Sequence, residues 1–100
     1  MILAAVSPAA DTATLLFTID KARNISEILI VNRTASSINV IVWGLPHDQV
    51  REDKYRWASN IAIPANSTLA LLETTTFPMA LGEKIEVQAD ATGVNFILIG

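Results

Sequence analysis

Short apolar runs rich in β-branched residues recur along the whole chain, and turn residues separate them at regular intervals. No window shows the sustained 3.6-residue period of an amphipathic helix, so the pattern predicts an all-β chain. The regular spacing of the turns is typical of a single antiparallel β-sandwich or jelly-roll-like domain. The expected strands are Thr14–Ile19, Ile25–Asn32, Ile38–Leu45, Tyr55–Ile63, Thr68–Glu73, Lys84–Ala89 and Val94–Ile99, with Ile2–Val6 as a candidate eighth.

The distribution of apolar residues differs between these strands. The segment KIEVQAD alternates apolar and polar residues, which predicts a strand with one face in water. By contrast, EILIVN, INVIVWG, TLALLE and VNFILIG carry apolar side chains on both faces. A chain of this size buries only about two-thirds of its unfolded surface, so it cannot cover both faces of these strands within its own fold. We therefore expect a second apolar face that binds other protein chains, formed by Leu29, Val31, Ile41, Trp43, Leu69 and Leu71.

Two turns have a recognisable composition. The segment IPANST contains Pro64, which fixes φ, and Asn66, which tolerates positive φ, and the segment DATG precedes the last expected strand. Both are typical of hairpin turns.

The first eleven residues, MILAAVSPAAD, are interpreted as an N-terminal arm (1–11) ahead of the sandwich domain (12–100). The stretch lacks the positively charged region of a signal peptide, and Pro8 disfavours a helix. We expect Ile2–Val6 to dock as an added strand on a neighbouring subunit. All apolar runs are far shorter than the roughly 18 residues of a membrane span, so a soluble protein without a membrane partner is expected.

Composition excludes several classes of function. A length of 100 residues predicts one domain. The formal net charge is −3 and the Lys and Arg residues form no run, so nothing favours binding to nucleic acid. The absence of cysteine excludes disulfides and thiolate zinc sites.

The segment from Leu45 to Trp57, LPHDQVREDKYRW, is here called the charged segment, and it contains the only histidine of the chain. A single His has neither zinc-site spacing nor an HExxH partner, and the adjacent carboxylates alternate with Arg and Lys as in an ion-pairing loop. We expect no enzyme activity, metal or cofactor. The aromatic residues Trp43, Tyr55 and Trp57 form a candidate carbohydrate platform or interface anchor, and the alternative is that the tryptophans pack across neighbouring strands.

The order of segments resembles a group of small virion proteins of tailed bacteriophages. The resemblance spans nearly the whole chain, although residues 20–24 replace the Pro-Ala-Gly turn of that group. The matching positions are Leu16, Phe17, Thr18, Val31, Asn32, Thr34, Ala35, Ile63, Ala65, Asn66, Thr68, Leu69, Leu81, Gly82, Ile85, Val87, Val94, Asn95 and Phe96.

The resemblance implies a non-enzymatic capsid decoration (cement) protein on the virion surface, made in the host cytoplasm. It would form a homo-oligomer, a trimer by analogy, and bind the major capsid protein. The alternatives are a tail, collar, baseplate or fibre module, and a carbohydrate-binding receptor module. The residues expected at interfaces are Ile2, Leu3, Val6, Trp43, His47, Asp48, Arg51, Glu52, Asp53, Lys54, Tyr55, Arg56 and Trp57.

Overall fold

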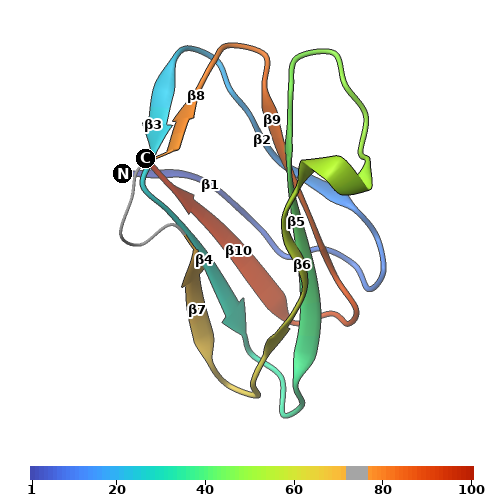
Figure 1. The fold of residues 1–100 in the computed structure, drawn as a ribbon. Helices are drawn as coiled ribbons and strands as arrows, with labels where there is room; N and C mark the ends of the chain where they lie inside the picture. Colours follow the sequence, from blue (N-terminus) through green and yellow to red (C-terminus); the bar gives the residue numbers. More distant parts are fainter. Residues whose placement is uncertain (72–76) are drawn as a thin grey trace.

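The alternating apolar segments form two four-stranded antiparallel sheets in the computed structural model, which describes residues 1–71 and 77–100 (Figure 1). The first sheet has the strand order β1-β10-β4-β7, with β1 (Ile2–Val6), β10 (Val94–Ile99), β4 (Glu27–Asn32) and β7 (Thr68–Leu71). The second sheet has the order β2-β9-β5-β6, with β2 (Thr14–Thr18), β9 (Lys84–Ala89), β5 (Ile38–Leu45) and β6 (Arg56–Ile63). The prediction of an all-β sandwich is confirmed.

The chain passes from one sheet to the other at each connection between these strands except that from β5 to β6. This alternation gives the strand order of a jelly roll. It also shows that the hairpin prediction for IPANST and DATG was wrong, because each segment links strands of different sheets. The local chemistry was read correctly, since Asn66 has a φ of 54° and Gly93 a φ of 90°.

The core lies between the two sheets and consists of the inward side of each alternating strand. Phe96 on β10 is fully buried at its centre, and β9 shows the predicted alternation with Ile85 and Val87 inside. Side chains below 2% exposure come from both sheets and include Ile28, Ile30, Leu98, Val40, Val42, Ile85, Val87 and Phe96. Burial of such side chains contributes roughly 1.5–3 kcal/mol each to folding.

The fold differs from the sequence-based expectation in several places, and β2 ends at Thr18, one residue before the expected Ile19. A short two-stranded sheet pairs β3 (Arg23–Ile25) with β8 (Phe77–Met79), and Ser26 separates β3 from β4. A 3₁₀ turn, η1 (Asp53–Tyr55), precedes β6, so that strand begins one residue later than expected. The pairing of β3 with β8 was not expected, because strands of three residues are too short to show a period of two. A proline in β8 further weakens the strand pattern. The expected strand Thr68–Glu73 is observed as far as Leu71, and its remainder lies outside the described residues.

The N-terminal segment is part of the chain's own first sheet. β1 pairs with β10, placing Ala5 opposite Ile97, and the Met1 ammonium donates to the Gly100 carbonyl over 3.1 Å. The two ends of the chain consequently lie together (Figure 1). This corrects the expected docking on a neighbouring subunit. The physical reason is that Leu3, along with other β1 side chains, packs against the core and so completes the sandwich.

Candidate interaction surfaces

The outward side of the first sheet carries mostly apolar residues, and we call it the apolar outer face. The strand registers place Ala5, Ile97, Leu29 and Ala70 in one row across all four strands. In the neighbouring rows, Ile99 lies beside Ile2, and Val31 lies beside Asn95. The apolar outer face therefore consists of Ile2, Ala5, Leu29, Val31, Ala70, Ile97 and Ile99.

The side chains of the apolar outer face contact water in the single chain. Ile2 is 66% exposed, and Leu29, Val31, Ile97 and Ile99 are only partly buried. A groove of about 300 Å³ lies on this side of β1 and β10, lined by Ala5, Val6, Ser7, Asn95 and Ile97. A sheet face of this composition is typical of a surface that binds protein.

Of the residues expected on a second apolar face, Leu29 and Val31 do face outward on the first sheet, whereas the others do not lie on this face. Leu69 and Leu71 lie opposite Ile30 and Ile28 in the register, so their side chains point into the core. Ile41 and Trp43 belong to β5 in the other sheet.

Charged side chains lie at both ends of the apolar outer face. Glu27 begins β4 opposite Ile99, and Arg33 follows directly after β4. The Arg33 amide donates to the Gly93 carbonyl over 3.0 Å, which continues the pairing of β4 with β10 by one step. The Arg33 Nε donates to Oδ1 of Asn95 over 3.2 Å, so the guanidinium lies on the same side of the sheet as Asn95.

On the second sheet, the charged segment folds back over Trp43. This indole lies opposite Glu86 on the outward side of β5, yet it is only 5% exposed. The guanidinium carbons of Arg51 and Arg56 each lie 5.8 Å from the Trp43 ring. Arg51 also pairs with the Glu86 carboxylate, and Arg56 with Asp53 over 3.2 Å. The two arginines thus bind within their own chain and shield the tryptophan from water.

The remaining ionic residues of the charged segment are exposed. His47 Nε2 lies 3.2 Å from Oδ2 of Asp48, and Lys54 Nζ lies 3.5 Å from Oε2 of Glu52. Tyr55 is partly buried, and its ring lies 5.3 Å from the Lys54 ammonium. Pairs as exposed as these contribute about 0–1 kcal/mol to folding, so their side chains are free to meet another molecule at little cost.

The aromatic residues do not form one exposed platform. Trp43 is on the outward side of the second sheet, whereas Trp57 packs against the core over the backbone of Gly44. The two rings therefore lie on opposite faces of their sheet, and the structure shows the alternative in which both tryptophans pack across strands.

The residues expected at interfaces thus fall into separate places. Ile2 lies on the apolar outer face, whereas Leu3 and Val6 pack against the core. The charged segment lies on the opposite side of the sandwich. Sequence reasoning named neither Ile97 nor Ile99 as an interface residue, although the apolar character of both faces of VNFILIG was the signal for them.

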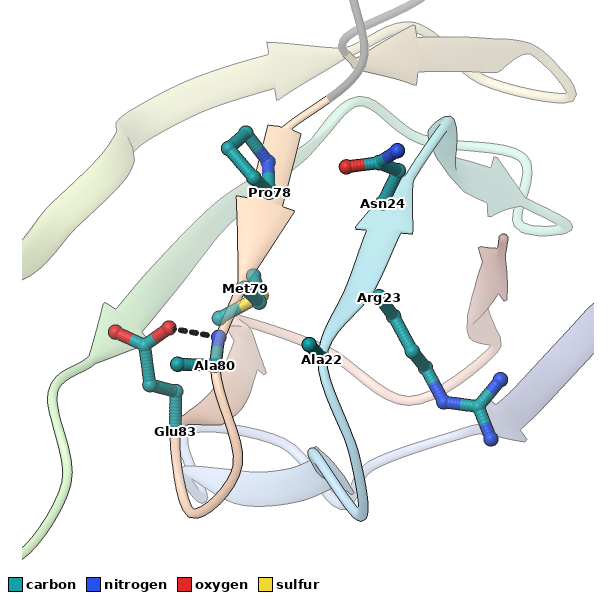
Figure 2. A pocket seen from close by; sticks show the side chains of 7 residues that line it. All are labelled: Ala22, Arg23, Asn24, Pro78, Met79, Ala80 and Glu83. Atoms are coloured by element: carbon teal, nitrogen blue, oxygen red, sulfur yellow. Dashed lines mark hydrogen bonds between the residues drawn. The ribbon is translucent and has the colours of Figure 1, made fainter.

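A groove of about 450 Å³ lies beside β3 and β8, lined by Ala22, Arg23, Asn24, Pro78, Met79, Ala80 and Glu83 (Figure 2). Its charged groups already have partners in the chain. The Glu83 carboxylate accepts from the Ala80 amide, and the Arg23 guanidinium points away from β8 and pairs with Asp20 over 2.7 Å. The hydrogen bond from Arg23 lowers the pKa of the Asp20 carboxyl, and the same bond raises the pKa of Arg23.

Within residues 1–71 and 77–100, no His, Asp or Glu side chains gather in a group able to hold a metal ion. No helix in that part of the chain has the length and apolar character needed to cross a membrane. Comparison with protein-family models, curated proteins and solved structures found no match for this chain.

The contacts over Trp43 lead to a stability prediction. Arg51→Ala should lower the free energy of unfolding by about 1–2 kcal/mol, because it removes an ion pair and a cation–π contact and exposes the indole. Chemical denaturation and iodide quenching of tryptophan fluorescence would measure the two effects. Lys54→Ala is the matched control in the same segment and should change neither quantity. Equal behaviour of the two variants would contradict the proposed role of Arg51.

Proposed function

We propose that this chain is a non-enzymatic structural subunit, a capsid decoration protein that associates with copies of itself and binds the shell of the major capsid protein. The observation that carries the proposal is the apolar outer face, which extends across every strand of the first sheet. An isolated sandwich normally turns polar side chains outward from such a sheet. An apolar face there favours a subunit that functions in a larger assembly.

The two sides of the sandwich differ in chemistry, and this difference supports distinct roles. The apolar outer face suits a permanent contact between subunits, whose buried areas are largely apolar. The charged segment on the other side offers His47, Asp48, Glu52 and Lys54 to a partner such as the shell. Mixed charges of this kind determine partner choice and register more than affinity.

The fold agrees with this proposal. Jelly rolls occur in viral capsid proteins and in lectins, and function has to be argued from surfaces instead of topology. The virion assignment derives from the resemblance to small phage proteins. Of its alternatives, carbohydrate binding is less well supported, because Trp43 is buried under Arg51 and Arg56. A tail, collar, baseplate or fibre module would use the same apolar outer face.

A decoration protein of this kind would act through binding energy alone. A subunit that binds the assembled shell more tightly than the free capsid protein stabilises the shell by mass action. It would work at the virion surface after synthesis in the host cytoplasm. The resemblance favours a trimer by analogy, whereas the charges at the two ends of the apolar outer face favour a two-fold contact between copies.

The proposal is tested by placing a charge on the apolar outer face. Leu29→Lys should abolish self-association and weaken co-sedimentation with empty shells of the major capsid protein, since a buried unpaired ammonium is strongly unfavourable. Leu15→Lys is the matched control for self-association, because Leu15 is a 50% exposed leucine on β2 of the other sheet. Self-association that is equal in both variants, or shell binding that is absent in the native chain, would contradict the proposal.

A further inference from the structure

We propose that the apolar outer face is covered by the same face of a second copy, related by a two-fold axis that passes between Leu29 and Val31. This inference rests on the proposed function and specifies the surface and symmetry of the contact between copies. The evidence is the distribution of charge along β4. Glu27 stands at one end of the face and Arg33 at the other, with apolar residues between them.

The positions of Glu27 and Arg33 match the symmetry of a two-fold contact. The six steps from Glu27 to Arg33 correspond to roughly 20 Å of strand. A two-fold axis that lies between the sheets, perpendicular to the strands, places β4 over β4 of the second copy with reversed direction. Glu27 of each copy then lies over Arg33 of the other, and the same ion pair forms twice.

The side chains between these charges suit the same arrangement. Reversal of β4 packs Leu29 against Val31 of the second copy, and the row through Ala5, Ile97 and Ala70 lies near the centre of the contact. Sheets packed face to face lie about 10 Å apart, a gap that a glutamate and an arginine can bridge from the rim. Isologous contacts need such a self-complementary surface.

The charge of the Met1 ammonium does not oppose the arrangement. The ammonium lies at the same end of the sheet as Glu27 and is bonded to the Gly100 carbonyl. In the two-fold contact β1 lies over β1, and because β1 ends at Val6, level with Ile30, the ammonium lies past the end of β1 of the second copy. A heterologous contact, as in a trimer formed through this face, would place a different surface patch opposite Glu27 and Arg33 and would not require these two charges to match.

Charge reversal and its rescue test the contact in the full-length chain. Glu27→Arg and Arg33→Glu should each weaken the dimer by about tenfold or more in sedimentation velocity, because like charges then meet twice across the interface. The double variant should restore the dissociation constant to within about threefold of the native value, because the pair is re-formed with its signs exchanged. Lys21→Glu changes an exposed lysine outside this sheet by the same charge and should have no effect.

The neutral variants Glu27→Gln and Arg33→Gln provide a second measurement if a reversed variant fails to fold, and each should weaken the dimer by about threefold. If the two reversals together weaken the dimer by the product of their separate effects, the two-fold contact is overturned. A native chain that forms only trimers or monomers would overturn it as well. If the native chain is monomeric but Leu29→Lys still abolishes shell binding, the proposed shell binding stands, whereas the proposed self-association and this inference fail. Rescue of the dimer in the double variant, without any binding of the native chain to the shell, would support the two-fold contact and contradict the proposed function.

Discussion

Asn32→Asp is expected to lower the free energy of unfolding by roughly 3–5 kcal/mol at neutral pH, although it exchanges a single amide nitrogen for oxygen. Asn32 is 1% exposed at the end of β4. Its Nδ2 donates to the carbonyls of Ser36, Ile63 and Pro64 over 2.8, 3.0 and 3.1 Å. Its Oδ1 accepts from the Thr34 amide and hydroxyl. A carboxylate has no proton to donate, so the three carbonyl oxygens would face a buried negative charge.

The loss from Asn32→Asp should depend on pH in a defined direction. Burial among carbonyls raises the pKa of the new aspartate above its unfolded value of about 3.9. The destabilisation caused by Asn32→Asp is then small at a pH below the unfolded pKa and grows as the pH rises toward the folded pKa. Denaturation curves at neutral and acidic pH would measure it. Asn95→Asp is the control, because Asn95 already accepts from the Arg33 Nε and needs no donor there. Equal losses in both variants would contradict the role given to Asn32.

Gly44→Ala is expected to cost roughly 2–4 kcal/mol of folding free energy and to shift tryptophan fluorescence. A methyl group at Gly44 would lie 2.0 Å from the Cε2 and Cζ2 atoms of Trp57. Since the indole packs against the core, it has to leave its position or the strand has to move. Thermal unfolding with emission spectra would measure both consequences.

The control for this prediction is a compensating double variant. Combining Gly44→Ala with Trp57→Leu removes the clashing ring, so alanine should cost much less in that background than in the native chain. An unchanged cost, or a single Gly44→Ala variant with native stability and emission, would show that Trp57 does not occupy this position.

The sequence predicted the strands best where turn residues such as Gly, Pro, Ser or Asp bound a run rich in apolar residues. Ile38–Leu45, Lys84–Ala89, Val94–Ile99 and Ile2–Val6 all have the expected bounds. Side-chain alternation reports which residues share a face, but it does not report which strands share a sheet. For this reason the sequence alone places Leu69 and Leu71 on an outward face and favours hairpins at IPANST and DATG, whereas the structure shows neither.

The candidate site was predictable only in part. Irregular pairing between β5 and β6 shifts the register between Val40 and Val42 and again before Trp43, so simple alternation could not show that Trp57 faces the core. The role of Asn32 could not be predicted, because its partners Ile63 and Pro64 lie in the corner between β6 and β7, about thirty residues away. Contacts of Arg51 with Glu86 likewise join segments that no local pattern relates.

Sedimentation of the native chain over a range of concentrations shows whether copies of this chain cover the apolar outer face. An oligomer is expected at micromolar concentration and should dissociate on dilution, and Leu29→Lys should remain monomeric throughout. A native chain that stays a monodisperse monomer at micromolar concentration, with the same sedimentation coefficient as Leu29→Lys, would show that no second copy covers this face.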